Sequence, residues 1–300
     1  MRKITASYLL ATFLCHNTWI SKKIADERYL KILFKGYMNE RLDLEEPRTF
    51  NEKLQWLKLY DRDPLYTTLV DKYEVKKYVA SIIGDNYIIP TLGIWEGISD
   101  IDYDNLPDQF VLKCTHDSGG VVICKDKQQF DRKKAEKIIE KSLKKNFYYE
   151  GREWPYKNVK PRIIAEEYKE DSACGELRDY KFFCFDGVVK ALFIATDRQK
   201  KNEDTKFDFF DEKYNHLPFT NGHPMANVVP KKPICFEKMK ELAAKLSKDI
   251  PQVRVDFYEV DGKIYFGELT FSHWSGLTPF VPNEWDKVFG DWIKLPPKRI

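Results

Sequence analysis

Two acidic side chains near the carboxyl end lie in the segment VRVDFYEVDGKIYFGELTF, residues 253–271. Alternating apolar residues and a central Asp-Gly pair predict a β-hairpin there. A two-residue turn would place Asp256 and Glu268 on opposite faces of the hairpin, because side chains alternate along a strand. A three-residue loop over residues 261–263 pairs Asp256 with Glu268 and makes one face largely apolar. Burial therefore favours the register that brings the two carboxylates together.

Paired carboxylates at this spacing suit a magnesium ion. Mg²⁺ prefers oxygen ligands and completes its coordination with water or phosphate oxygens rather than a full protein cage. The same register pairs Arg254 with Thr270 on the carboxylate face, where the guanidinium could offset charge on a transferring phosphoryl group. The alternative is a solvated strand pair whose acidic side chains simply face water.

The segment QFVLKCTHDSGGVVICKD, residues 109–126, places a loop with Ser118, Gly119 and Gly120 between two predicted strands. Glycines in such a loop let backbone N–H groups approach phosphate oxygens, and Lys113 can reach a phosphate as a point charge. No helix follows these glycines, so the segment is neither a Walker P-loop nor a dinucleotide fingerprint. A plain hairpin turn is the alternative.

Two other strand ends carry charge. In RIIAEEYKED, residues 162–171, an apolar strand runs into acidic residues, which could hold ribose hydroxyls beside an adenine bound to free backbone groups. A solvated acidic strand end is the alternative. In ELRDYKFFCFDG, residues 176–187, Arg178 and Lys181 are three residues apart, so they face opposite ways on an extended chain. We therefore expect one of the two to meet a ligand.

Composition narrows the classes of function. The chain has 300 residues, of which 43% are hydrophobic and 15% aromatic, enough for a core in one body of two or three lobes. Lys and Arg number 50 against 47 Asp and Glu, and the signs are interspersed, which argues against nucleic-acid binding. The six cysteines form no C-x-x-C pair, so we expect reduced thiols in a cytoplasmic protein rather than disulfides or a zinc site.

The start of the chain has one apolar stretch, residues 8–14. It is too short to span a membrane and lacks a small-residue cleavage site. A short amphipathic helix, packed on the body or resting on a membrane surface, fits better. This leaves peripheral association with the inner face of the cell membrane as a prediction.

The elements that position these residues follow from the periodicity of apolar positions. Within a largely helical first hundred residues and beyond it, stripes predict helices over 51–60, 71–83, 132–145 and 236–248. Short strands are predicted over 110–114, 121–125, 162–168, 180–186, 188–196, 253–260 and 264–271. Tight Asp-Gly turns indicate antiparallel sheets with packed helices, hence an α+β fold rather than a doubly wound one. Residues 198–233 show little periodicity and predict a long polar loop.

Taken in order, these segments resemble the ATP-grasp superfamily and, more closely, its TupA-like branch, associated with bacterial teichuronopeptide and surface-polysaccharide biosynthesis. The resemblance covers the chain from about residue 47 onward. It rests on FNEKLQWLKLYDRDPLYT (50–67), LPDQFVLKCTHDSGGVVICKD, EWPYKNVKPRIIAEEY (153–168), DYKFFCFDG and VRVDFYEVDGKIYFGELTF. It implies an ATP-dependent carboxylate–amine ligase that binds ATP between two antiparallel sheets and makes an amide through an acyl phosphate.

The resemblance also implies site residues. The implied ATP contacts are Lys72, Lys113, Ser118, Gly119, Gly120, Glu166, Glu167, Tyr168, Lys169, Glu170 and Glu176. The implied magnesium ligands are Asp256, Glu268 and Thr270. The residues expected to face the phosphoryl group or the carboxylate substrate are Arg254, Lys181 and Arg178.

Two positions depart from the family pattern. Thr270 stands where many ATP-grasp enzymes have asparagine, and Asp117 brings an acidic side chain into the loop expected to meet phosphates. For the acceptor, His273 and Trp274 could contact a sugar or an amine, or form a packed aromatic turn. Three arginines could bind a uronic acid carboxylate or form surface ion pairs: Arg152, Arg178 and Arg198.

We expect four segments along the chain. Residues 1–48 form a helical segment and 49–108 an N-terminal lobe, while 109–168 form a small lobe with the phosphate loop and 169–300 a large lobe with the metal hairpin. The expected substrates are a carboxylate-bearing sugar or glycan and an amine or amino acid.

Two other functions compete with the ligase. The tripeptide Asp61-Arg62-Asp63 has the D-x-D form with which metal-dependent glycosyltransferases hold a nucleotide sugar, although it follows a predicted helix rather than a buried strand. A nucleotide-binding protein without turnover, in a polysaccharide assembly, is the second alternative. The three functions can be distinguished by which nucleotide stabilises the protein and by whether it releases ADP and phosphate.

Overall fold

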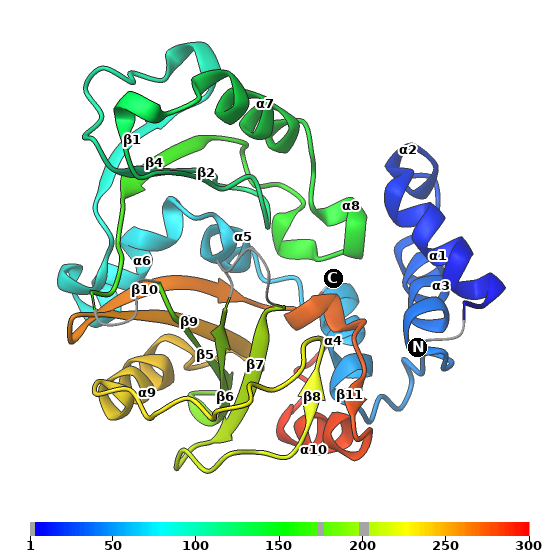
Figure 1. Cartoon of the computed structure of the whole chain (residues 1–300). Helices are drawn as coiled ribbons and strands as arrows, with labels where there is room; N and C mark the ends of the chain where they lie inside the picture. The colour runs from blue at the N-terminus through cyan, green and yellow to red at the C-terminus, as the bar shows by residue number, and fades with distance from the viewer. Residues whose placement is uncertain (1–3, 173–176, 198–203, 300) are drawn as a thin grey trace.

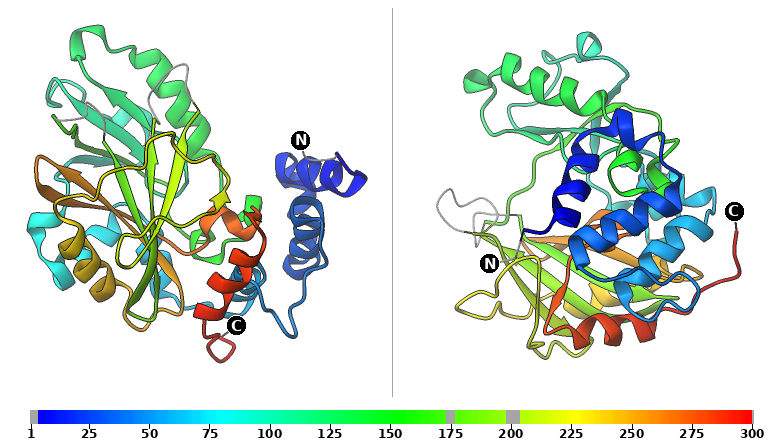
Figure 2. Two further views of the ribbon diagram at one scale, coloured as in Figure 1. Left: turned by 60° about the horizontal axis from the view of Figure 1, so that its bottom comes forward. Right: turned by 90° about the vertical axis from the view of Figure 1, so that its right-hand side faces the viewer.

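Two antiparallel sheets, one above the other, form the body of the protein (Figure 1). The structure is a computed structural model that describes residues 4–172, 177–197 and 204–299. Helices lie between and outside the sheets, and a helical unit at the N-terminus stands to one side (Figure 2). The predicted α+β class is confirmed.

The smaller sheet belongs to the upper lobe in Figure 1 and has the order β1-β4-β2-β3. Its strands are β1 (Thr91–Trp95), β2 (Phe110–Cys114), β3 (Val122–Cys124) and β4 (Ile163–Glu167). Helix α7 (Arg132–Leu143) packs on one face, where Phe110, Leu112 and Cys114 of β2 join Ile139 in a buried cluster. Because side chains alternate along a strand, Lys113 faces the other way, toward the larger sheet.

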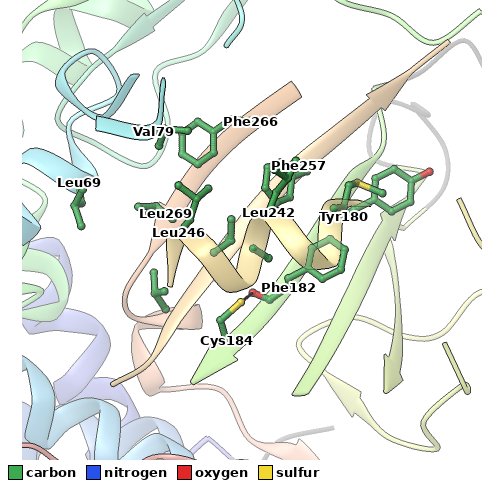
Figure 3. Close-up of a cluster of buried hydrophobic side chains, with 14 of the residues drawn as sticks. Leu69, Val79, Tyr180, Phe182, Cys184, Leu242, Leu246, Phe257, Phe266 and Leu269 are labelled. Atoms are coloured by element: carbon green, nitrogen blue, oxygen red, sulfur yellow. Dashed lines mark hydrogen bonds between the residues drawn. The ribbon is translucent and has the colours of Figure 1, made fainter. Parts of the chain in front are cut away.

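The larger sheet has the order β10-β9-β5-β6-β7. Its strands are β5 (Asp179–Phe185), β6 (Val188–Thr196), β7 (Lys206–Asp211), β9 (Val253–Val260) and β10 (Lys263–Thr270). One face packs on α9 (Phe236–Leu246), with α5 (Leu65–Val70) and α6 (Glu74–Ile83) at the β10 edge (Figure 3). The other face packs on α4 (Phe50–Tyr60) and α10 (Glu284–Trp292) through a second, phenylalanine-rich cluster.

The β9–β10 hairpin reaches the predicted pairing by an unexpected route. Asp261 and Gly262 both have positive φ, 50° and 73°, so the turn has two residues, and the predicted three-residue loop is wrong. A bulge at Gly267 then shifts the register by one residue, so that Glu268 pairs with Asp256 and Thr270 with Arg254. The predicted pairing of the carboxylates is therefore confirmed.

The N-terminal unit is helical, as predicted, and consists of α1 (Ala6–His16), α2 (Thr18–Ser21) and α3 (Asp26–Met38). It is joined to α8 (Tyr148–Gly151) through Arg152, whose guanidinium donates to the carbonyls of Ser21 and Tyr149 and pairs with Asp26 at 2.9 Å. Arg152 is 1% exposed and stacks 4.1 Å from the Tyr29 ring. The role of substrate ligand considered for Arg152 is therefore wrong: it attaches the helical unit. In the described part of the chain, no helix has both the length and the apolar character that a membrane span requires.

The prediction of a long polar loop over 198–233 is wrong for residues 206–211. Residues 206–211 form the edge strand β7, because Phe207 and Phe209 insert into one cluster and Phe210 into the other. Farther on, β8 (Thr220–Asn221) pairs with β11 (Phe280–Val281). The alternating phenylalanines therefore favour a strand here, although the flanking residues are polar. Arg198 lies outside the described residues.

Candidate active site

A buried cluster of charged residues lies on the α4 face of the larger sheet, at the centre of which is Arg254 on β9. Its Nε and Nη2 donate to Oδ1 and Oδ2 of Asp256, each at 2.7 Å. Nη2 also donates to Glu268 at 2.9 Å and to the Thr270 hydroxyl at 3.0 Å. The bulged hairpin thus collects both predicted carboxylates on one guanidinium, whose pKa they raise although burial alone would lower it.

Lys181 on β5 completes this cluster from the neighbouring strand. Its ammonium donates to Oδ2 of Asp256 and lies 3.1 Å from a carboxylate oxygen of Asp179. Burial lowers the pKa of Lys181 against the opposing attraction of Asp256. The charge of Arg178 acts on Tyr214, which packs among the α9-face side chains and whose pKa is raised mainly by burial. The expectation that only one of Arg178 and Lys181 meets a ligand stays a prediction.

Glu268 is the accessible carboxylate of the pair. Its side chain is 41% exposed, whereas Asp256 is fully buried. Burial would raise the pKa of Glu268, but the charges of Lys181, Arg254 and Lys72 outweigh it and lower the pKa to about 2. Glu268 therefore presents a permanent negative charge at the mouth of the cluster.

His273 is a neutral positioning residue behind Arg254. An arginine only donates, so Nδ1 of His273 accepts from Nη1 of Arg254 at 2.9 Å, and Nε2 donates to Oδ1 of Asn221 at 3.0 Å. Asn221 is oriented for this by donating its amide N–H groups to the carbonyls of Thr278 and Pro279. Burial, Arg254 and Lys181 all lower the pKa of His273. The sequence suggested His273 as a contact for the acceptor substrate. Its burial and its hydrogen bonds to Arg254 and Asn221 instead explain its presence.

The predicted phosphate loop folds onto α7. The hydroxyl of Ser142 donates to the carboxylate of Asp117, which is 3% exposed. Gly120 has a φ of 56°, and a Cβ at this position would overlap the Ser142 hydroxyl, so the turn requires glycine. Asp117 therefore faces inward, which explains its presence in this loop. Ser118 and Gly119 form the exposed tip of the loop.

Lys72 links this loop to the charged cluster. Its ammonium donates to the Asp117 carbonyl, and its charge also acts on Glu268. Tyr156 is 8% exposed, and burial together with the charges of Glu153 and Glu268 raises the pKa of its hydroxyl well above the usual value. Lys72 is thus the residue that relates the glycine loop to the hairpin, and its role as a phosphate contact stays a prediction.

A second set of charges lies between the two sheets. Glu166 on β4 is 5% exposed and pairs with Lys113 at 2.6 Å and with Lys76 at 2.5 Å. They line a small cavity, about 10 Å³, whose other wall includes Phe266 and Gly267 of β10. Lys76 lies on α6, and the sequence analysis did not single it out. The available signal was its position four residues after Lys72 in the predicted helix over 71–83, although the observed α6 begins only at Glu74.

Ionisation of Glu166 should make the unfolding free energy depend on pH in the acid range. Burial opposes ionisation, but Lys113 and Lys76 lower the pKa of Glu166 to about 2 from 4.5. The stabilisation is complete above pH 4.5 and is lost as the pH falls toward 2, because the unfolded chain binds the proton first. Wild type should exceed Glu166→Gln by about 3 kcal/mol in unfolding free energy near neutral pH. Urea titrations between pH 6 and 3 should show this difference shrinking; a difference independent of pH would contradict the assignment.

The remaining predicted nucleotide contacts lie at the end of β4. Glu167 pairs with Lys169 at 2.7 Å, and its backbone N–H donates to the Pro90 carbonyl. The Tyr168 hydroxyl donates to Glu170, which pairs with Lys125 at 2.9 Å. Within the described residues, these partners all lie outside the Arg254 cluster. Glu176 lies outside the described residues.

The D-x-D tripeptide has a structural role. Arg299 near the C-terminus donates to Asp61 at 2.9 Å and to Asp63 at 2.8 Å, while Arg62 pairs with Asp26. Asp61 is 5% exposed. Because both carboxylates already hold the chain terminus, the geometry gives no support to a nucleotide-sugar site there.

The hairpin oxygens fit magnesium only in part. In the regions that the structure describes, no three acidic, histidine or cysteine side chains are placed to hold a metal ion. Asp256, Glu268 and Thr270 nevertheless offer hard oxygen donors around one guanidinium, with Glu268 open to the exterior. This set suits Mg²⁺ if further ligands come from phosphate or water, the usual arrangement for this ion.

A comparison with family models gives one match, to the TupA-like ATPgrasp model, over residues 52–294. The chain belongs to the TupA-like ATP-grasp family. The predicted family is therefore confirmed. No curated protein matches the sequence.

Solved structures resemble the TupA-like chain only distantly. The D-alanine–D-alanine ligase of Helicobacter pylori is 16% identical, with a TM-score of 0.41 over 82% of this chain and 69% of its own. The Bacillus anthracis D-alanine–D-alanine ligase complexed with ATP is also 16% identical, with a TM-score of 0.39 over 68% and 55%. The ATP-grasp ligase PsnB with minimal precursor, Mg and ADP is 9% identical, with a TM-score of 0.40 over 74% and 57%. The chain thus spans little more than half of the latter two, and the likeness concerns the fold alone.

Proposed function

We propose that this TupA-like protein is an ATP-dependent carboxylate–amine ligase that joins an amine or amino acid to a uronic acid of a bacterial surface polysaccharide. The observation that supports it most directly is the buried cluster of Arg254, Lys181, Asp256 and Glu268, next to Lys72 and the glycine loop. It combines cations for a transferring phosphoryl group with oxygen donors for Mg²⁺. The four-segment division of the chain stays part of this proposal.

ATP would lie between the two sheets in this proposal. Lys72 from the turn before α6, Lys76 from α6 and Lys113 from β2 converge there, and they exceed the single negative charge of Glu166. The cavity of about 10 Å³ holds at most a single water, so nucleotide binding requires the sheets to separate. A triphosphate would then replace Glu166 as the partner of these lysines.

In the proposed reaction, a substrate carboxylate oxygen attacks the terminal phosphorus of ATP, and the bond to the bridging oxygen breaks to release ADP. The amine nitrogen then attacks the carbonyl carbon of the acyl phosphate, and the carbon–oxygen bond breaks so that phosphate leaves with the electron pair. Of the two protons that the ammonium loses, one ends on phosphate and one in solvent. Bound Mg²⁺ would supply charge neutralisation at the phosphate oxygens. Arg254 and Lys181 would stabilise charge on the same groups.

Product release tests the proposal. ADP and phosphate should appear only when ATP, Mg²⁺, a carboxylate and an amine are all present, with glucuronate or galacturonate as first carboxylates. Thermal stabilisation should follow ATP with Mg²⁺ and not a UDP-sugar. Stabilisation by the UDP-sugar would favour the glycosyltransferase, and ATP binding without ADP release the non-catalytic protein.

Association with a membrane surface stays a prediction for the N-terminal unit. Five large apolar side chains are exposed there: Ile4, Leu9, Leu10, Phe13 and Trp19. Such a surface favours the boundary between lipid headgroups and acyl chains. Failure to co-sediment with anionic vesicles would contradict it.

A further inference from the structure

A cavity of about 250 Å³ lies at the seam between the N-terminal helices and the body. Its walls come from α1, α3, the region of α8, and the turn η5 (His273–Gly276) that follows the metal hairpin. The lining residues that matter here are Cys15, Tyr37, Glu150, Glu153, Trp274 and Ser275. In Figure 1 the helical unit stands beside α8, which α1 and α2 contact.

The turn connects this cavity to the Arg254 cluster. His273 accepts a hydrogen bond from Arg254, and the next two residues, Trp274 and Ser275, line the cavity. Both have left-handed backbones, with φ of 49° and 55°, a costly conformation for side chains of these types. The turn therefore places the cavity wall one residue from the group that holds both hairpin carboxylates.

A buried carboxylate faces the cavity without a cation in contact. Glu153 is 4% exposed, and no ion pair within 4 Å reaches it from the described residues. The nearby ammonium of Lys58 donates instead to Gln55, to the Gly151 carbonyl, and to the carbonyl and hydroxyl of Ser275. Burial raises the pKa of Glu153 to about 7, although the charge of Lys58 and a hydrogen bond with the Ser275 side chain oppose the rise. A ligand with N–H donors would remove this desolvation penalty.

We infer that this cavity binds the ammonium group of the amine co-substrate, an inference that rests on the proposed ligase function. Glu150 adds a second carboxylate, only loosely paired with Lys145 at 3.7 Å. Tyr37 and Trp274 add aromatic side chains, which attract cations, and the lining contains no lysine or arginine. Acidic and aromatic walls without a basic residue select a cation over a second carboxylate.

The location also assigns a role to the N-terminal helices. Cys15 and Tyr37 belong to α1 and α3, outside the residues 52–294 that match the family model. One wall of the cavity is therefore built from a segment that the family pattern does not include. The choice of amine should accordingly depend on this segment, whereas phosphoryl transfer depends on the hairpin.

Hydroxylamine separates the two parts of the reaction. It is small and uncharged at neutral pH, so it traps an acyl phosphate as the hydroxamate without an ammonium site. With ATP, Mg²⁺ and glucuronate or galacturonate, we compare hydroxamate formation with amide formation from a mixture of the twenty common amino acids. Glu153→Gln should lower the ratio of amide to hydroxamate about tenfold to hundredfold. Glu259→Gln, also buried but bonded to backbone N–H groups far from the cavity, is the matched control.

A second variant leaves unchanged the carboxylate whose charge acts on the buried Lys58. Cys15→Phe fills the cavity from α1 and should lower the same ratio, while Cys235→Phe, at a similarly half-buried site on the large lobe, should not. An unchanged ratio in both Glu153→Gln and Cys15→Phe overturns the inference while leaving the ligase intact. Absence of hydroxamate with wild type removes the ligase function, and the inference with it.

Thiol labelling tests the cavity even if no amino acid in the mixture reacts. Aminoethyl methanethiosulfonate, a cation, should modify Cys15 at least about tenfold faster than the anionic sulfonatoethyl reagent, because charge attracts the reagent to the site. Peptide mapping identifies the site, and Cys235 calibrates the two reagents. Glu153→Gln with Glu150→Gln should abolish the preference. Equal rates at Cys15 in wild type overturn the inference.

Discussion

Glu268→Gln should lower ADP release by about two to three orders of magnitude and leave the fold intact. The substitution keeps the shape but removes the accessible negative charge, and with it an oxygen donor suited to Mg²⁺ beside the phosphoryl group. Because the Glu268 side chain is 41% exposed, its ion pair with Arg254 should contribute no more than about 1 kcal/mol to stability. Activity and stability should therefore separate at this position.

Glu74→Gln is the matched control for this prediction. The Glu74 side chain is 45% exposed and pairs with Arg162 at 2.8 Å, close to the 41% and 2.9 Å of Glu268 with Arg254. Steady-state ADP release as a function of Mg²⁺ concentration, with thermal unfolding, is the measurement. Equal activity and equal Mg²⁺ dependence in the Glu268→Gln and wild-type proteins would contradict the metal role.

The hairpin shows how far sequence reasoning reached in this protein. Burial of one face correctly required Asp256 and Glu268 to share the other, but pairing could be achieved by a longer turn or by a bulge. The chain uses the bulge at Gly267, where a Cβ would lie 3.1 Å from the Asp256 carbonyl. The apolar pattern predicts which face of the hairpin the two carboxylates share. It does not predict the bulge that sets the register, because a bulge depends on the local backbone conformation.

The roles of other residues could not be predicted from the sequence, because they depend on tertiary contacts. Asp117 looked misplaced among phosphate-binding groups until α7 supplied Ser142 as its partner. Arg152 has the chemistry of a carboxylate ligand, yet its donors are used by the N-terminal helices. Glu153 gave no local signal, since its cavity is assembled from segments more than a hundred residues apart. Segment types are read from periodicity, but such long-range pairings are not.

Asp256→Asn should be far more damaging to the fold than Glu268→Gln. Asp256 is fully buried between Arg254 and Lys181, so its neutralisation removes the carboxylate that the two buried cations share. Each cation then keeps a single carboxylate partner, Glu268 for Arg254 and Asp179 for Lys181. Removing one partner of a buried ion pair costs about 3–5 kcal/mol. Urea unfolding at neutral pH should show this loss, together with loss of ADP release.

The double variant Asp256→Asn with Lys181→Met tests the cause. Removing the ammonium takes away one of the two cations that lose this carboxylate, so the double variant should be at least about 2 kcal/mol more stable than the sum of the single effects. Asp256→Asn alone should also gain stability as the pH rises. Burial already lowers the pKa of Lys181, and without Asp256 it falls further below the unfolded value of about 10.4, so the unfolded chain binds more protons over that range. Additive effects and a flat pH profile would show that Asp256 does not neutralise Lys181, and the role of this carboxylate as the centre of the cluster would have to be abandoned.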